Sequence, residues 1–315
     1  MEKRRIGSLE VSVAGLGCNN FGWRIDAAAT AKVVDAAIEA GINFLDTADM
    51  YGGGQSEEFL CRALGDRRNQ IVLATKFGLK MDEHRQGAKP AYVRQAVEDS
   101  LRRLGTDYID LYQLHRPDAS TPIADTLEAL DGLVKAGKVR EIGCSNFSAA
   151  QLREAEGAVR AGAARFVSVQ NHYSLMYREP EAEVLPECVR LGLAFIPFFP
   201  LAGGLLTGKY RTGEPLPEGS RAKDGWDWPK LITPENIARA EALARFAESA
   251  GHTLLELGMS WMAAQPAVAS VIAGAKTPEQ VKANASSVGW RMTPGEIAEV
   301  EKIVSAAAGL KSHAG

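Results

Sequence analysis

The chain has 315 residues, of which 46% are hydrophobic, and its 36 basic and 39 acidic residues leave a formal charge of −3. This near balance gives no indication of the basic surface that nucleic-acid or membrane binding would require. The N-terminal residues contain no apolar segment that could act as a signal peptide, and no later run reaches membrane-spanning length, so we expect a cytoplasmic protein.

Cysteine and histidine spacing gives no sign of a metal or disulfide framework. The cysteines at 18, 61, 144 and 188 are far apart and include no C-x-x-C pair. The five histidines lack a ligand spacing such as H-E-x-x-H. We therefore expect reduced thiols and no bound metal.

Eight short apolar runs indicate strands buried on both faces, as a parallel sheet requires. Although the length alone would suggest about two domains, α/β barrels often reach this length as one domain, and no linker divides this chain. The pattern predicts a single-domain (β/α)8 TIM barrel over residues 1–315, with a hairpin over 4–13 at its N-terminal mouth. The predicted strands lie at about 11–18, 42–47, 71–76, 108–115, 140–146, 166–171, 193–199 and 270–274.

Local patterns mark where the intervening helices begin. Pro90 fits the first position of a helix, and apolar residues recur at helical spacing after it. Thr-Pro pairs and three capping-box matches predict further N-caps. The pairs begin at Thr121, Thr233, Thr277 and Thr293, and the boxes join Ser148 to Gln151, Thr277 to Gln280 and Thr293 to Glu296.

Two long irregular stretches, at about 78–90 and 203–232, interrupt the alternation. Both follow strands, so we expect them on the C-terminal face, where barrel enzymes place their active sites. Trp226 and Trp228 in the second stretch could cover a substrate or merely pack the loop down.

Asp46, Tyr51, Lys76 and His115 each follow or end an apolar run. A free tyrosine has a pKa of about 10, and a nearby Lys76 cation would pull that pKa toward neutrality while Asp46 kept Lys76 charged. His115 could hydrogen-bond a carbonyl oxygen. The set therefore predicts proton transfer to a carbonyl oxygen, with hydride as the group that the carbon receives.

Two glycine-rich patterns argue against other nucleotide-binding folds. Gly15 and Gly17 lack the third glycine of a Rossmann fingerprint, and the stretch 203–210 has Tyr210 where a P-loop requires Ser or Thr.

The eighth strand offers a better phosphate site. It leads through Lys276 into the helix capped by Thr277, whose free N–H groups attract anions. Arg221 would add charge, which favours NADP over NAD, although Lys276 could also be an ordinary solvated lysine.

Along nearly its whole length the sequence resembles the aldo-keto reductase family. The matching stretches are 41–52, 74–76, 110–115, 143–146 and 169–171. The resemblance implies that Tyr51 is the proton donor, that Lys76 and Asp46 tune it, that His115 orients the carbonyl and that a nicotinamide delivers the hydride. It thus implies an NADPH-dependent reductase of aldehydes or ketones.

The same resemblance implies a set of cofactor contacts. The carboxamide would be bound by Ser145, Asn146 and Gln170, with Phe198 against the ring. Phe198 and Phe199 stand where the family often has Tyr or Trp followed by Ser, so a hydroxyl contact is lost. The other expected cofactor-binding residues are Cys18, Asn19, Asp46, Phe199, Pro200, Leu201, Ala202, Gly203, Lys209, Arg221, Gly274, Lys276, Gln280 and Asn284.

Trp23, Met81 and Trp226 lie in the loops that we expect to form the substrate walls. The partner is therefore a small carbonyl compound or alcohol, and the sequence indicates neither the physiological substrate nor the oligomeric state.

Three other functions compete with this interpretation. In a barrel aldolase Lys76 would form a Schiff base, and in a glycosidase Asp46 would act with a second acid; a carboxylate beside the lysine opposes the first. A nucleotide-binding regulatory subunit, as in aldo-keto-like potassium-channel partners, would keep the fold. His115, where some such partners differ, favours catalysis.

Overall fold

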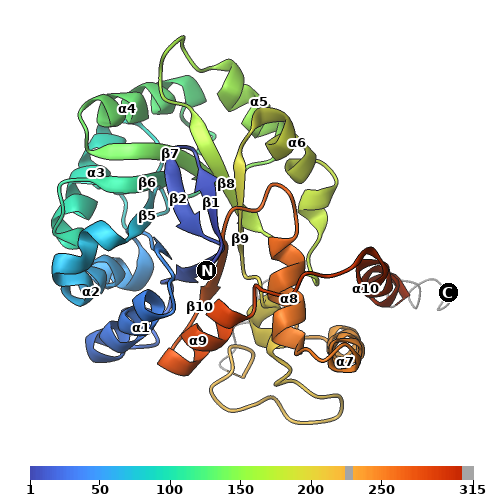
Figure 1. Ribbon diagram of the computed structural model, residues 1–315. Helices are drawn as coiled ribbons and strands as arrows, with labels where there is room; N and C mark the ends of the chain where they lie inside the picture. Colours follow the sequence, from blue (N-terminus) through green and yellow to red (C-terminus); the bar gives the residue numbers. More distant parts are fainter. Residues whose placement is uncertain (224–229, 307–315) are drawn as a thin grey trace.

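Parallel strands form a closed sheet at the centre of the computed structural model, which describes residues 1–223 and 230–306. Their order around the sheet is β10-β3-β4-β5-β6-β7-β8-β9 (Figure 1). Their bounds are β3 Ala14–Gly17, β4 Phe44–Asp46, β5 Val72–Phe77, β6 Ile109–Leu114, β7 Val139–Ser145, β8 Phe166–His172, β9 Ala194–Phe198 and β10 Val271–Gly274.

The barrel closes where β9 meets the residues just before β10. The Phe195 N–H donates to the Ala267 carbonyl at 2.7 Å, and the Ala269 N–H donates to the Phe195 carbonyl at 3.0 Å. Each of the eight strands overlaps one of the predicted apolar runs. The predicted (β/α)8 barrel is therefore confirmed.

A hairpin of β1 (Lys3–Ile6) and β2 (Leu9–Ser12) covers one end of the barrel, as the sequence predicted. In Figure 1 it lies across the middle of the view, next to the N-terminus. Ile6, Leu9 and Val11 are buried in one cluster with barrel residues that include Phe44 and Leu111. Burial of this apolar surface closes the N-terminal mouth and leaves the opposite end open for a site.

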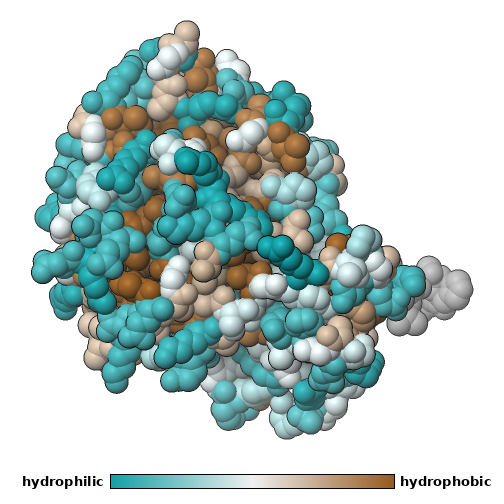
Figure 2. Space-filling model, viewed as in Figure 1, coloured by the Kyte–Doolittle hydropathy of each residue, from teal (hydrophilic) through white to brown (hydrophobic). Residues whose placement is uncertain are grey.

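The helices surround the sheet, and α10 lies at the edge of the molecule beside α7 (Figure 1). Hydrophilic residues predominate on the face shown in Figure 2, and apolar residues appear in smaller areas among them. The bounds are α1 Ala27–Glu39, α2 Gln55–Leu64, α3 Pro90–Leu104, α4 Ile123–Lys135, α5 Ala149–Gly157, α6 Val184–Leu191, α7 Pro234–Ser249, α8 Leu254–Ala263, α9 Pro278–Ser286 and α10 Pro294–Ala306, with 3-10 turns η1 Tyr51–Gly54, η2 Gly65–Gln70, η3 Glu179–Glu181 and η4 Ala202–Thr207.

Most of the predicted helix starts are confirmed. Pro90 opens α3, Thr233 caps α7, and both Ser148 and Thr293 form reciprocal capping boxes. Thr277 caps α9 by accepting from the Gln280 N–H.

Two details of the predicted caps are wrong. The Gln280 side chain accepts from the Lys276 N–H at 2.7 Å instead of completing the box with Thr277. Helix α4 begins at Ile123 without a side-chain cap, because the Thr121 hydroxyl donates to Asp118 Oδ2 at 2.8 Å. A nearby carboxylate thus takes the hydroxyl that the pattern assigned to the helix.

The first long irregular stretch follows β5 and ends where α3 begins, and the second follows β9 and contains η4. Both leave the carboxyl ends of their strands, opposite the hairpin. None of the helices in the described part of the chain is both long enough and apolar enough to span a bilayer. Within that same part, potential metal ligands do not gather into a group that could hold an ion.

Candidate active site

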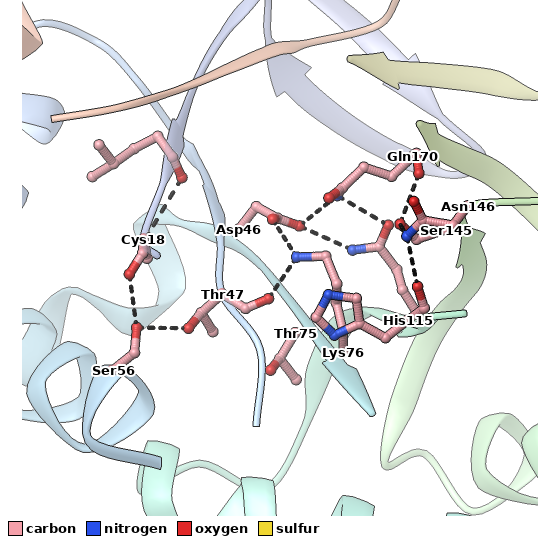
Figure 3. A network of polar contacts seen from close by, with 12 residues as sticks. Cys18, Asp46, Thr47, Ser56, Thr75, Lys76, His115, Ser145, Asn146 and Gln170 are labelled. Atoms are coloured by element: carbon pink, nitrogen blue, oxygen red, sulfur yellow. Dashed lines mark hydrogen bonds and ion pairs between the residues drawn. The ribbon is translucent and has the colours of Figure 1, made fainter. Parts of the chain in front are cut away.

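The four reactive residues meet at the open end of the barrel because their strands are neighbours. Asp46 ends β4, Lys76 lies near the end of β5, and His115 follows β6 directly. Tyr51 opens η1, five residues beyond Asp46. Because β4, β5 and β6 are parallel and adjacent, their carboxyl ends bring Asp46, Lys76 and His115 to one place (Figure 3).

The Asp46 carboxylate is the centre of a buried hydrogen-bond network (Figure 3). Lys76 Nζ donates to Asp46 Oδ1 at 2.5 Å and to the Thr47 carbonyl at 2.8 Å. Gln113 Nε2 and Gln170 Nε2 donate to Asp46 Oδ2 at 3.0 and 2.8 Å. A buried ion pair is tolerated when further hydrogen bonds satisfy its atoms, and this one is so satisfied.

Sequence reasoning did not single out Gln113, although a signal was present. It is a polar residue two positions before His115 in a mostly apolar strand, and it lies opposite Lys76 in the β5–β6 register. Its bond to Asp46 links β6 to β4 across β5. Gln113 therefore helps to fix the carboxylate that holds Lys76.

Lys76 is a buried cation. Its side chain has no exposed surface, and burial alone would lower the pKa of its amine. The negative charge of Asp46 and the neighbouring Tyr51 phenol outweigh burial and raise the pKa above its usual value. A lysine held in this charged form cannot be the free amine that a Schiff base requires, which argues against the aldolase alternative.

Tyr51 lies against this cation, with Lys76 Nζ 5.2 Å from the centre of the phenol ring. Burial raises the pKa of Tyr51 above 10, and the positive charge of Lys76 opposes that rise without reversing it. Lys76 thus lowers the pKa as expected, but the expected net fall toward neutrality is wrong because burial has the larger effect. The Tyr51 phenol keeps its proton at neutral pH and is available as an acid.

His115 faces Tyr51 edge to face, with the ring centres 5.9 Å apart. Burial lowers the pKa of His115 well below its usual value, and the charges of Lys76 and Arg116 lower it further. Its Nδ1 is buried and has no hydrogen-bond partner among the described residues. His115 is thus a neutral imidazole, suited to hydrogen bonding at the site and not to carrying charge.

A cavity of about 450 Å³ opens above this network, and Tyr51, His115 and Asp46 form part of its wall. Lys76 is not part of the wall, but it contacts two residues that are, Asp46 and Tyr51. Most of the residues expected to bind the cofactor line the cavity: Cys18, Asn19, Asp46, Ser145, Asn146, Gln170, Phe198, Phe199, Pro200, Leu201, Gly203, Lys209, Arg221, Gly274, Lys276, Gln280 and Asn284.

Ala202 departs from this expectation, because its side chain is buried in the core and does not reach the lining. Several lining residues were not predicted, although most of them adjoin predicted ones along the chain. They are Gly17, Asn20, Arg24, Arg116, Gly204, Thr207, Gly219, Leu255, Ile272, Ala273 and Ala283.

The ends of β7 and β8 present amide groups in a fixed arrangement. Ser145 Oγ and the Asn146 N–H both donate to the Gln170 carbonyl, at 2.7 and 3.0 Å, and the Asn146 backbone has a φ of 61°. Asn146 Nδ2 donates to the His115 carbonyl at 2.9 Å. The side-chain N–H groups of Asn146 and Gln170 are therefore occupied, the latter by its bond to Asp46, and the side-chain oxygens of both residues remain as acceptors.

Phe198 provides an aromatic surface on the same wall. Its ring stacks on His172, with centres 5.6 Å apart and planes 16° apart, and Phe199 packs edge to face against it. The Phe198 ring is therefore held in place from behind.

Four cations gather at the other end of the cavity: Arg24, Lys209, Arg221 and Lys276. Burial and the charges of the other three lower the pKa of Lys209, and burial and Arg24 lower the pKa of Arg221. Such mutual repulsion is unfavourable unless an anion lies among the cations. Arg24 had no signal in the sequence beyond its closeness to Asn19.

Two of the three predicted substrate residues, Trp23 and Met81, are described by the structure, and neither lines the cavity. Trp23 is 57% exposed and stacks with the Arg24 guanidinium, 4.5 Å from its ring centre. Met81 is half-buried outside the lining. Trp226 and Trp228 lie outside the described residues, so the expectation for them is untested.

Comparison with known proteins gives a consistent result. The sequence matches the model of the Aldo/keto reductase family over residues 14–305. It is 36% identical over 297 residues to the Uncharacterized oxidoreductase YqkF of Bacillus subtilis (strain 168), with 92% of each chain covered.

Two further similarities matter for function. The sequence is 32% identical over 318 residues to a probable voltage-gated potassium channel subunit beta of Arabidopsis thaliana, covering 96% of this chain and 97% of that one. The structure is similar to the glycerol dehydrogenase AKR11B4 from Gluconobacter oxydans, with a TM-score of 0.84, 31% identity and coverage of 97% and 95%.

Proposed function

Because this chain belongs to the aldo/keto reductase family of oxidoreductases, we propose that it reduces aldehydes or ketones to alcohols with NADPH. The observation that carries the proposal is the contact of a protonated phenol, Tyr51, with the buried ion pair of Lys76 and Asp46. This arrangement lies in the wall of a cavity large enough for a small-molecule site.

The residues of the cavity fit NADPH. The side-chain oxygens of Asn146 and Gln170 can accept from a carboxamide, and the Phe198 ring offers a stacking surface. The four clustered cations, with the N-terminus of α9, match a phosphate-rich ligand. When bound, NADPH would supply a hydride to the carbonyl carbon.

The backbone at Gly274 also suits a close-fitting ligand, since this position bears no side chain at the cavity. A Cβ placed there would lie 3.2 Å from Asn20 Nδ2 and 3.3 Å from Asn19 Oδ1. The absence of a side chain thus keeps β10 and the Asn19 loop close together beside the cation cluster.

The chain's own groups carry the proton chemistry. Tyr51 gives its proton to the carbonyl oxygen, while His115 donates a hydrogen bond to that oxygen and orients it. The phenolate that remains is stabilised by Lys76, whose charge is in turn held by Asp46. The neutral state of His115 suits this role, because a charged imidazole beside Lys76 would be repelled.

The Arabidopsis relative supports a second candidate, a nucleotide-binding subunit that serves assembly. Such a protein would bind NADPH and turn over little substrate. Tyr51, Lys76, Asp46 and His115 are all present and assembled here, which favours catalysis.

Turnover separates the two candidates. We expect the purified protein to consume NADPH with a panel of aldehydes and ketones, and to reduce NADP+ with alcohols such as glycerol if the reverse direction dominates. Binding of NADPH without turnover of any member of the panel would support the subunit role instead.

A Tyr51→Phe variant tests the acid. Its kcat should fall by about a hundredfold or more, while NADPH still quenches the protein fluorescence as in the parent. The matched control is Tyr108→Phe, which removes a phenol hydroxyl just before β6, at the hairpin end of the barrel. Full kcat in Tyr51→Phe would show that another group donates the proton.

We also propose that the chain is one domain that acts in the cytoplasm. The four cysteines are all unpaired, as expected for a reducing compartment.

A further inference from the structure

A fifth cation, Arg116, lies at the reacting end of the cavity, apart from the cluster of four. It follows His115 in the chain, lines the same cavity and is exposed. After burial and Lys76, its positive charge also lowers the pKa of His115, whereas the cations that act on Lys209 and Arg221 come from within the cluster of four. Arg116 is therefore near the imidazole and not part of the proposed phosphate site.

Arg116 has no hydrogen bond or ion pair with any residue in the part of the chain that the structure describes. Two described carboxylates close to it in the chain or in the cavity wall, Asp118 and Asp46, bond to other groups. Asp118 accepts from Ala88 N and Thr121 Oγ1 through Oδ2, and from Ser120 through Oδ1.

Asp46, the one carboxylate among the described lining residues, is held by Lys76, Gln113 and Gln170. The Asp118 contacts also fix the turn after β6, so Arg116 projects from an ordered segment. The result is a guanidinium with no hydrogen-bond or ion-pair partner among the described residues, beside the groups that would bind a carbonyl.

We propose that Arg116 is a specificity-determining residue that binds a carboxylate on the substrate, so that the preferred substrates are aldehydes or ketones bearing an acid group. This inference rests on the proposed reductase function. The planar fork of a guanidinium matches the two oxygens of a carboxylate, and charge-assisted bonds of this kind are among the stronger polar contacts.

The acid group takes no part in the reaction. The carbonyl carbon receives a hydride from NADPH, the carbonyl oxygen receives the Tyr51 proton, and the products are a hydroxy acid and NADP+. The carboxylate stays ionised throughout and serves only to anchor the substrate.

The test uses pairs of substrates that differ only in this charge: 4-formylbenzoate against its methyl ester, and 4-oxobutanoate against its methyl ester. For each pair the ratio of kcat/KM, acid over ester, is measured in the parent and in Arg116→Gln. Intrinsic reactivity and any change in His115 affect both members alike in one enzyme form, so the change in ratio isolates the charge contact.

We expect the ratio to fall about tenfold in Arg116→Gln for at least one pair, mainly through a higher KM for the acid. Arg116→Lys should keep part of the ratio because it keeps the charge. The control Arg102→Gln removes a 70% exposed arginine on α3, outside the cavity, and should leave the ratio unchanged. Added salt should lower the parent's ratio.

The outcomes separate this inference from the function on which it rests. If the parent reduces the esters by a Tyr51-dependent reaction and neither ratio changes in Arg116→Gln, the carboxylate site is refuted and the reductase function stands. If the parent reduces no member of either pair and no other carbonyl in the panel, the reductase function itself fails.

Discussion

A buried acid behind the Tyr51 loop, Asp49, makes the stability of this protein depend on pH in an unusual direction. Its side chain is 1% exposed, and neither carboxylate oxygen has a hydrogen-bond partner among the described residues. Its neighbour Glu57 is also buried and is bonded to Thr75 and Arg103, each at 2.6 Å. Arg103 thus pairs with Glu57 and forms no bond with Asp49.

Burial, with the charge of Glu57, raises the pKa of Asp49 to about 7 despite the opposing charge of Arg103. The unfolded chain has the ordinary value of 3.8. Because the folded pKa is the higher one, the folded state binds the proton more tightly, and stability is lost as pH rises from about 4 to about 7. The shift corresponds to roughly 4 kcal/mol once the pH exceeds both values.

Replacing Asp49 by Asn removes this titration. The free energy of unfolding is measured by urea denaturation for the variant and the parent. The value for the variant minus that for the parent should increase by about 3 kcal/mol from about pH 5 to about pH 8. Any constant cost of a buried amide drops out of this comparison. Glu128→Gln, which removes an exposed acid on α4, is the control and should parallel the parent.

Parallel curves for the parent and Asp49→Asn across this range would refute the argument. They would mean that the ionised carboxylate is paired with a cation or solvated by water in the folded protein, so that its pKa does not rise on folding.

Three further outcomes test the site. Gly52→Ala should destabilise the protein by about 1–3 kcal/mol and lower kcat, because φ is +59° and the new Cβ would lie 2.9 Å from the Phe21 carbonyl oxygen. In the control Gly53→Ala, φ is similar but no atom lies within 4 Å of the new Cβ. Thermal denaturation should therefore show a smaller loss of stability for Gly53→Ala than for Gly52→Ala. Because the pKa of His115 is well below 6.5, the pH profile of kcat/KM should show no ionisation of this residue near pH 6.5. An ionisation near that pH that is present in the parent and absent in a His115→Gln variant would contradict this. Lys276→Ala should weaken NADPH binding about tenfold and NADH binding less by fluorescence titration, and equal losses would refute a phosphate contact for this residue.

The strands and helix starts were predictable because their signals are local. An apolar run such as 109–114 records burial on both faces within a few residues. Ser148 and Gln151 form their capping box across a single turn, so no distant group decides it. The assignment of the whole chain to one domain and the roles of the individual site residues stay predictions.

Other features failed or were missed because a second segment decides them. Thr121 is drawn away from its helix by Asp118, and Trp23 points outward to stack with Arg24. Gln113 reaches Asp46 from a different strand.

The sequence by itself determined which residues end the parallel strands, and hence that a phenol, an amine, a carboxylate and an imidazole meet at one end of a barrel. Only the tertiary structure decided their charge states, since a pKa sums burial and charge over every group that barrel closure brings near. That is why Tyr51 retains its proton, with a pKa above 10, although Lys76 lies beside it. The gathering of Arg24, Lys209, Arg221 and Lys276, which come from distant parts of the chain, has the same origin.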